Sequence, residues 1–450
     1  MNAGSDAPAA GHPAIPDRDV DAAFGGWERF GHIALAVSGG ADSTALLLLA
    51  HAWTVRRPPP LPRITVLTVD HGLRAASATE ADWVKALAAA LGFAHETLAW
   101  TGAKPTTGIQ ARARTARYGL MTRTCREAGI EALVTAHTAD DQAETLVMRL
   151  ARGSGVDGLA AMAEVSHLDG IAILRPLLGM TRVRLEAFLR ERGQHWIEDP
   201  SNRDDKYERV RIRRDLRERQ ALGLTVESLA LSAKRLRRAR DVLEAAATGF
   251  LTAAIDVRDA GYAEIGIEAL LEAPEEIALR ALSRMACAFG GRTLPPRLAR
   301  LEALYGALRG GVRDATLGGC AFAIRRAKLL VTREYGRMSM RAVVVHPGQQ
   351  LLWDGRFTIS LPPDCPVGLL LRPLGPDGLA ALHAMGGGMG TDPRAAALAL
   401  PSLWQDGCLR FTPFAAWETF EPPEWLDGAT ACFAGRAALF GRLRDAEIHL

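Results

Sequence analysis

Short apolar runs and longer amphipathic segments alternate in the first part of the chain. The runs at residues 32–37, 63–70 and 131–137 are continuous rather than alternating in polarity, and residues 94–100 form a weaker fourth run. Continuous apolar runs of this length are typical of strands buried on both faces of a parallel sheet. We therefore expect these four segments to be the strands of such a sheet.

The segments that separate these runs have the spacing of helices. Residues 41–53, 78–92 and 108–129 follow a helical pattern, and the last two end on glycine, as helices commonly do. Alternating strands and helices predict an α/β fold with a doubly wound, mostly parallel sheet. In such sheets ligands bind at the carboxyl ends of the strands.

The second half of the chain has a different pattern. Arginine is dense between residues 174 and 240, and residues 274–291 and 295–311 have the pattern of amphipathic helices. Residues 340–364 alternate like β-structure, and the tail that follows is rich in glycine and proline. We expect a flexible tail at 1–27, an α/β catalytic domain at 28–220, a helical domain at 221–340 and a small α+β domain at 341–450.

Composition narrows the class of protein. The chain has 450 residues, of which 48% are hydrophobic, so it can bury a large core. Its first residues are acidic and proline-containing rather than basic and apolar, which argues against a secretory signal, and no apolar run is long enough to span a membrane. The six cysteines form no C-x-x-C pair, so we expect reduced structural thiols, no membrane partner and a cytoplasmic protein.

The stretch Ser38-Gly39-Gly40-Ala41-Asp42-Ser43 lies between the first predicted strand and the first predicted helix. Glycines at this point let the backbone approach a ligand, and the unpaired N–H groups of a helix start attract an anion. A Walker loop would need a lysine that does not follow here. The stretch therefore predicts a phosphate cradle of another kind, the alternative being an ordinary glycine-rich turn with acidic residues near the helix start.

Two other predicted strands end in polar residues. Asp70 and His71 follow the second strand, and His137 follows the strand at 131–137. Next come Asp140, Asp141 and Glu144. Asp141 and Glu144 are three residues apart, so they share one face of a helix, and such a pair can hold Mg²⁺ or an ammonium group. Any one of these residues alone is as well explained by a packed histidine or a solvated helix start.

The stretch at residues 38–43 resembles the PP-loop of the N-type ATP pyrophosphatases, which cleave ATP between its α- and β-phosphates. With the segments at 113–118, 152–159, 175–178 and 199–202, the chain resembles the tRNA(Ile)-lysidine synthetase family. The resemblance is strong over the first 220 residues, moderate to about residue 334 and weak in the tail. This chain has Thr138 where many members have a second histidine, and Val210 where they have asparagine.

The resemblance implies an adenine nucleotide α-hydrolase-like fold and a carbon–nitrogen ligase. The family joins free L-lysine to C2 of the wobble cytidine in the isoleucine tRNA with anticodon CAU. ATP is converted to AMP and diphosphate through an adenylylated cytidine. The cofactors implied are ATP and Mg²⁺, the helical domain would bind the tRNA, and either a monomer or a homodimer fits the family.

The resemblance also implies roles for individual residues. Residues 38–43 with Asp70 and His71 would bind ATP, and Asp42, His137, Asp141 and Glu144 would be catalytic. Asp141 and Glu144 would hold the lysine, and Asp42 and Asp140 the Mg²⁺. The tRNA would be bound by Arg114, Arg117, Arg203, Arg209, Arg211, Arg213 and Arg214.

The run of basic residues supports contact with RNA. Residues 209–219 contain too few acids to be neutralised by i,i+4 pairs, although solvated helix faces remain the simpler explanation of a charge run. The net charge of +3 is too small to decide this. Further phosphate contacts are expected from Lys206, Lys234, Arg235, Arg237, Arg238 and Arg240.

Two other functions stay open. The chain is alternatively another PP-loop tRNA-modifying or amidating ligase, although a thiolase would need paired cysteines and Cys125 stands alone. It is alternatively a nucleotide-binding module without catalysis. The carboxylates Asp141 and Glu144 argue against that alternative, because a passive binder has little need of them.

Overall fold

The computed structural model describes residues 15–72, 77–101, 109–198, 206, 208–218, 223–417, 425 and 428–441. The described residues form two compact units, and the division between them falls between Arg240 and Asp241. The boundary falls inside the long helix α9 (Val226–Ala254). Each unit is described by itself.

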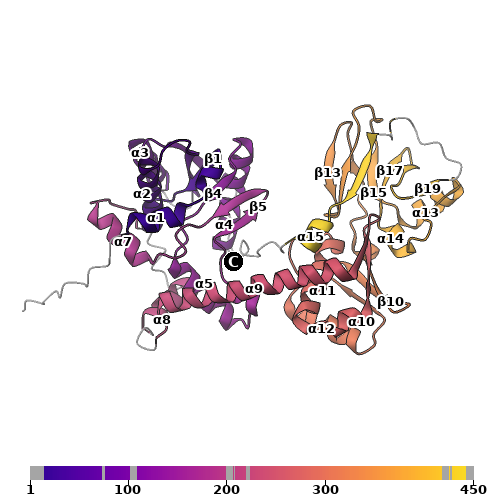
Figure 1. Ribbon diagram of the computed structural model, residues 1–450. Helices are drawn as coiled ribbons and strands as arrows, with labels where there is room; N and C mark the ends of the chain where they lie inside the picture. The colour runs from indigo at the N-terminus through magenta and orange to yellow at the C-terminus, as the bar shows by residue number, and fades with distance from the viewer. Residues whose placement is uncertain are drawn as a thin grey trace, which may run out of the picture. The chain divides into compact units, whose positions relative to one another are not determined.

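A six-stranded sheet in the order β3-β2-β1-β4-β6-β5 forms the centre of the described part of the first unit (Figure 1). All neighbouring strands are parallel except β5 and β6, which pair antiparallel. The doubly wound, mostly parallel sheet is thereby confirmed. Its strands are β1 (His32–Ala36), β2 (Arg63–Asp70), β3 (Ala94–Ala99), β4 (Ala132–Val134), β5 (Val165–Leu168) and β6 (Ile171–Leu174).

Helices cover both faces of this sheet. Ile33 and Leu35 of β1 pack with α2 on one face, whereas Ala34 between them packs with α4 on the other, because successive side chains of a strand point to opposite faces. The helices of this unit are α1 (Asp17–Phe24), α2 (Ala41–Arg56), α3 (Ser77–Ala90), α4 (Ile109–Glu127), α5 (Ala139–Ala151), α6 (Val156–Leu159), α7 (Arg182–Glu191) and α8 (Glu208–Glu218).

The structure differs from the expected flexible tail at residues 1–27. Within residues 15–27 the chain forms the helix α1, and Phe24 and Trp27 pack against Trp53 of α2 at ring-centroid distances of 6.5 and 5.6 Å. The acidic and proline-rich composition hid these aromatic anchors, which bury enough surface to fix the short helix α1. Residues 1–14 lie outside the described part of the chain.

The strand order reverses direction between β1 and β4. From β1 the chain adds β2 and then β3 on one side, and it returns to place β4 directly on the other side of β1. Doubly wound sheets bind ligands in the crevice at such a switch point, beyond the carboxyl ends of the strands. The two segments that lead out of β1 and β4 here are residues 37–40 and 135–138.

Helices and a sheet share the first part of the second unit. Besides α9, the helices are α10 (Ile267–Glu272), α11 (Glu275–Gly290) and α12 (Leu298–Arg309), which confirm the expected helical content. An antiparallel sheet in the order β7-β8-β11-β10-β9 was not predicted, because its strands are short and three helices separate β8 from β9 in the chain. Its strands are β7 (Ile255–Arg258), β8 (Tyr262–Gly266), β9 (Asp314–Leu317), β10 (Cys320–Arg325) and β11 (Lys328–Arg333).

The remainder of the second unit is mixed α and β, and one hydrophobic core runs from Leu251 to Leu439 through both of its parts. The sheets have the orders β12-β15-β17-β18, β13-β14-β20 and β16-β19. The strands are β12 (Val343–Val344), β13 (Gln350–Trp353), β14 (Phe357–Ser360), β15 (Leu370–Pro373), β16 (Gly387–Gly388), β17 (Pro401–Gln405), β18 (Cys408–Phe411), β19 (Ala416–Trp417) and β20 (Thr430–Phe433). The helices are α13 (Gly375–Ala384), α14 (Arg394–Leu398) and α15 (Arg436–Phe440).

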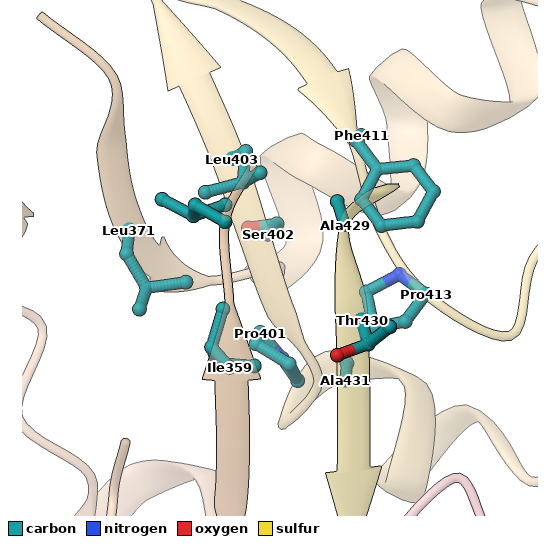
Figure 2. A pocket seen from close by; sticks show the side chains of 11 residues that line it. Ile359, Leu371, Pro401, Ser402, Leu403, Phe411, Pro413, Ala429, Thr430 and Ala431 are labelled. Atoms are coloured by element: carbon teal, nitrogen blue, oxygen red, sulfur yellow. The ribbon is translucent and has the colours of Figure 1, made fainter. Parts of the chain in front are cut away.

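A small cavity lies among these strands. Figure 2 shows that its wall is mostly apolar, with Ile359, Leu371, Leu403 and Phe411 around it. The volume open to the centre of a water molecule is only about 10 Å³, so the cavity holds one water molecule at most. No titratable side chain lines it, and we assign it no chemistry.

Candidate active site

The loop after β1 has a backbone that only glycine suits at one point. Gly39 has φ +86°, and a Cβ added there would lie 2.5 Å from Cδ1 of Ile197. The N–H of Ile197 also donates to the carbonyl of Gly39 over 2.9 Å. The segment around Ile197 therefore packs directly on the loop and holds its turn in place.

Hydrogen bonds within the loop preform its shape. The hydroxyl of Ser43 accepts from the N–H of Ser38 at 3.2 Å and donates to the carbonyl of Gly40 at 3.0 Å. The hydroxyl of Thr44 donates to the carbonyl of Gly39 at 3.1 Å. Helix α2 begins at Ala41, so its first N–H groups lie at the open end of this loop. The loop thus has the features of a phosphate cradle.

Asp42 in the first turn of α2 forms a forked ion pair with Arg182 at the start of α7. Nε of Arg182 donates to both carboxylate oxygens at 3.0 and 3.2 Å, and Nη2 donates to Oδ2 at 2.6 Å. Burial raises the pKa of Asp42, and the charges of Asp141 and Asp140 raise it further, against the lowering effect of Arg182. Burial opposes the charge of Arg182, yet Asp42, Asp141 and Glu144 together raise its pKa.

The side chain of Asp140 binds the backbone of the same arginine. Its Oδ2 accepts from the N–H of Arg182 at 2.7 Å and so stabilises the start of α7. The sequence did not predict Arg182 as a site residue, because Arg182 is 140 residues away from its partner Asp42 and no local pattern connects the two. The structure makes it the common neighbour of the carboxylates on α2 and α5.

Helix α5 begins at the crevice with a capping box. Oδ2 of Asp141 accepts from the N–H of Thr138 at 2.9 Å and from its hydroxyl at 3.2 Å. Burial raises the pKa of Asp141, but His137, Arg182 and the bond from Thr138 outweigh it and leave that pKa below its ordinary value. Thr138, the residue that departs from the family pattern, is therefore the N-cap of the helix.

His137 and Glu144 are held in different ways. Nδ1 of His137 lies 2.9 Å from the hydroxyl of Thr135, and burial lowers the pKa of His137 although Asp141 raises it. Oε1 of the fully buried Glu144 accepts from Nε of Arg213 at 2.7 Å, whereas its Oε2 is buried and has no hydrogen-bond partner among the described residues. Burial, and then Asp141, raise the pKa of Glu144. A buried carboxylate oxygen without a partner is costly, so it is a natural point for a ligand to bind.

Asp70 is the last residue of β2, next to β1, and His71 follows it. Oδ1 of Asp70 accepts from the N–H of Gly72 at 2.8 Å and from the hydroxyl of Ser77 at 2.6 Å, so it orders the start of α3. The His71 ring packs edge-on against Trp100 at 6.1 Å.

The basic residues expected to contact RNA differ in their exposure. Arg114, Arg117 and Arg209 are half-buried, Arg213 is paired with Glu144, and the exposed ones are Arg211, Arg214, Lys206, Lys234, Arg235 and Arg238. Arg240 is buried. Arg203, the segment at 199–202 and Arg74 lie outside the described residues.

Arg237 serves the fold rather than the surface. Its Nη2 donates to the carbonyls of Ala160 and Ala161 at 2.5 and 2.8 Å. The side-chain amide of Gln142, on α5, exchanges two hydrogen bonds of 2.8 Å with the backbone of Met162 in the same segment. Gln142 thus holds the segment at residues 160–162 against α5, the helix that carries Asp141 and Glu144. Arg237 of α9 bonds to the same segment.

Comparisons with known proteins show the family of the chain. A family model described as a PP-loop domain matches residues 18–220. The tRNA(Ile)-lysidine synthase of Ruegeria pomeroyi is 40% identical over 392 residues, which cover 85% of this chain and 88% of that protein. The chain belongs to the tRNA(Ile)-lysidine synthase family.

Other members of the family match over similar lengths. The tRNA(Ile)-lysidine synthase of Methylobacterium nodulans is 45% identical over 312 residues, or 68% of this chain and 91% of that one. The tRNA(Ile)-lysidine synthase of Wolbachia pipientis is 36% identical over 346 residues, or 76% of this chain and 80% of that one. The family match thus extends beyond the PP-loop domain.

Neither a metal cluster nor a membrane-spanning helix is found among the described residues. Within the described ranges, no group of three or more histidine, cysteine or acidic residues is arranged to hold a metal ion. In the same part of the chain, no helix has the length and apolar character needed to cross a membrane.

Proposed function

We propose that this chain ligates L-lysine to C2 of the wobble cytidine in the isoleucine tRNA with anticodon CAU, at the expense of ATP. The observation that carries the proposal is the arrangement at the β1/β4 crevice. A preformed phosphate loop lies there beside two carboxylates with pKa values shifted in opposite directions, Asp141 downward and Glu144 upward. That combination suits activation by a nucleotide followed by attack of an amine.

The first step is adenylylation of the cytidine. The cytidine O2 attacks the α-phosphorus of ATP, the bond to the bridging oxygen breaks, and pyrophosphate leaves with the electron pair. The N–H groups of residues 38–43 at the start of α2 stabilise the leaving pyrophosphate, and Arg182 stands beside them as a fixed positive charge. Asp70 and His71 on the adjacent strand end are the proposed contacts to the rest of the ATP.

Asp42 and Asp140 are the proposed ligands of Mg²⁺. One or two carboxylates plus phosphate oxygens and waters are the usual set of ligands for this ion. Both oxygens of Asp42 are engaged by Arg182, so ion binding requires that pair to loosen. The ion would neutralise charge on the phosphates.

The second step needs a free amine. Lysine arrives as an ammonium with an ordinary pKa near 10.4, and its nitrogen must lose a proton before it attacks. Asp141 stays ionised and attracts the ammonium, and the buried Oε2 of Glu144, which has no partner, accepts its proton. The nitrogen then attacks C2, the C2–O2 bond breaks, and AMP leaves with that oxygen.

His137 and the arginines complete the site. Burial keeps His137 neutral at neutral pH, so it acts as a hydrogen-bond partner of the reacting phosphate or as a proton acceptor. Arg114, Arg117, Arg203, Arg209, Arg211 and Arg214 are the proposed contacts to tRNA, and Arg213 moves between Glu144 and the RNA.

One assay tests the function. The protein is incubated with ATP, Mg²⁺, labelled lysine and the unmodified tRNA, and we expect label in the tRNA with one AMP and one pyrophosphate per lysine. A tRNA with uridine at the wobble position is the substrate control. Asp42→Ala should abolish pyrophosphate release and leave tRNA affinity within about twofold, because Asp42 faces the phosphates. A wild-type protein that releases no AMP and labels no tRNA would refute the proposal.

A further inference from the structure

Beside the candidate active site, three arginines from two helices lack anionic partners among the residues that the structure describes. Arg114 and Arg117 come from α4 and Arg209 from α8, and all three are half-buried. None of the three forms an ion pair or donates a hydrogen bond to a described residue, and Nε of Arg114 and of Arg117 is shielded from solvent without a partner. A guanidinium has five N–H donors, and buried donors are almost always satisfied in native proteins.

The three charges also repel one another. Burial lowers the pKa of Arg114, and the positive charges of Arg117, Arg209 and Arg175 lower it further, against an opposing effect of Tyr118. The Arg114 and Arg117 guanidinium carbons lie 5.4 and 5.6 Å from the centre of the Tyr118 ring, so both side chains contact the same aromatic ring. A fixed cluster of like charges without a counter-ion is stabilised by an anion.

The cluster faces the reacting groups from one side of the sheet. Arg175, Arg114 and Arg117 all act on His137 electrostatically, and Arg209 acts on Asp141. Helix α4 packs on the face of the sheet opposite to α2, whose first turn carries the phosphate loop. The polyphosphate of ATP already has donors at that loop, so the cluster is available to a second phosphate.

We propose that Arg114, Arg117 and Arg209 form one subsite for a backbone phosphodiester that flanks the nucleotide to be modified. The inference rests on the proposed function, because a nucleotide whose base oxygen reaches the α-phosphate must bring its own backbone phosphates into the crevice. Arginine forks bind phosphate oxygens in pairs, which fixes orientation as well as charge. Exposed Arg211 and Arg214 continue from Arg209 along α8, as a track for the adjoining RNA would require.

The first test uses lysine variants, which keep the positive charge but lose the forked pair of guanidinium donors. Arg114→Lys and Arg117→Lys should each weaken binding of the tRNA about tenfold or more, while affinity for ATP stays within about twofold. Arg123→Lys, an exposed residue on the same helix, should change neither. Circular dichroism verifies that the variants are folded. Lost affinity for ATP with unchanged affinity for tRNA would show that the cluster holds ATP phosphates and would overturn the proposal.

The second test identifies the phosphate. Anticodon stem-loops carry a single neutral methylphosphonate on the 5′ or the 3′ side of the wobble cytidine, or at a linkage in the stem. One of the two flanking substitutions should weaken wild-type binding about tenfold and have little further effect in the Arg114→Ala Arg117→Ala variant. The stem substitution should act additively with the variant. Full additivity at both flanking positions would overturn the proposal.

These binding measurements are independent of turnover. A wild-type protein that binds the stem-loop with the expected coupling but forms no lysidine would refute the proposed function and leave the phosphate subsite standing. An active protein whose Arg114→Lys and Arg117→Lys variants bind tRNA normally would refute the subsite and leave the function standing.

Discussion

Gly39, in the phosphate loop, is constrained both by its backbone conformation and by its packing. Its φ of +86° is unfavourable for any residue with a Cβ, and that Cβ would lie 2.5 Å from Ile197. Gly39→Ala should therefore lower the free energy of unfolding by about 1–3 kcal/mol and weaken ATP binding. Urea unfolding and equilibrium ATP binding measure the two effects.

The adjacent glycine supplies the matched control. Gly40 has φ −68°, and the atom nearest to a Cβ added there is 3.9 Å away. Gly40→Ala should cost less than about 1 kcal/mol, because its backbone is accessible to any residue. Equal destabilisation by the two substitutions would contradict the proposed constraint at Gly39.

His137 gives the site a pH dependence with a defined sign. Burial lowers its pKa in the folded protein, so below its ordinary value near 6.5 the unfolded chain binds the proton first. The stability that depends on neutral His137 is present above pH 6.5 and is lost as the pH falls below it. The loss is at most about 1.4 kcal/mol per pH unit.

Replacement of the imidazole measures this dependence. Between pH 7.5 and 5.5, wild type should lose more stability than His137→Gln, as followed by hydrogen exchange in peptides covering β1 and β4. His383→Gln, which removes an exposed histidine of the second unit, should leave the wild-type pH dependence in those peptides unchanged. An identical pH response of wild type and His137→Gln would contradict a buried neutral imidazole.

At the scale of elements, the predictable features are those encoded in consecutive residues. The runs that form β1, β2 and β4 are predominantly apolar because both faces of the sheet are covered, and the pattern alone located them. The loop at residues 38–43 was also found, because its signal is local. The partners of its residues were not: Asp42 pairs with Arg182 and Glu144 with Arg213, far away in the chain.

The basic helices α8 and α9 show the same limit of sequence-based prediction. The sequence alone cannot distinguish an arginine exposed to solvent from one that bonds within the protein. Arg211 and Arg214 of α8 are exposed, whereas Arg237 of α9 donates to two carbonyls. Arg211→Ala Arg214→Ala should reduce the slope of log affinity for tRNA against log salt by about 1 for each lost phosphate contact. Arg237→Ala should leave the slope unchanged and lower stability. A reduced slope for Arg237→Ala would contradict its inward role.

At the scale of the whole molecule, the hydrophobic clusters follow the division into two units. Two clusters belong to residues 15–196, and the third extends from Leu251 to Leu439. The third cluster includes both the helices expected at 221–340 and the strands that follow, which sequence pattern assigned to different domains. Strands of four residues such as β7 and β20 carry too few positions to show an alternation, so their pairing was not predictable.

Separate cores predict separate unfolding transitions. A chain with two cores departs from two-state behaviour, and a ligand stabilises the unit that binds it. In rising urea, hydrogen exchange should show protection lost at different concentrations for peptides within residues 32–198 and within 251–439. ATP at about 100 times its dissociation constant should stabilise the first group by about 2.7 kcal/mol and leave the second unchanged. The Gly39→Ala variant should lose this shift, because the phosphate loop is in the first unit. A single transition that ATP moves as a whole would show that the two units unfold as one.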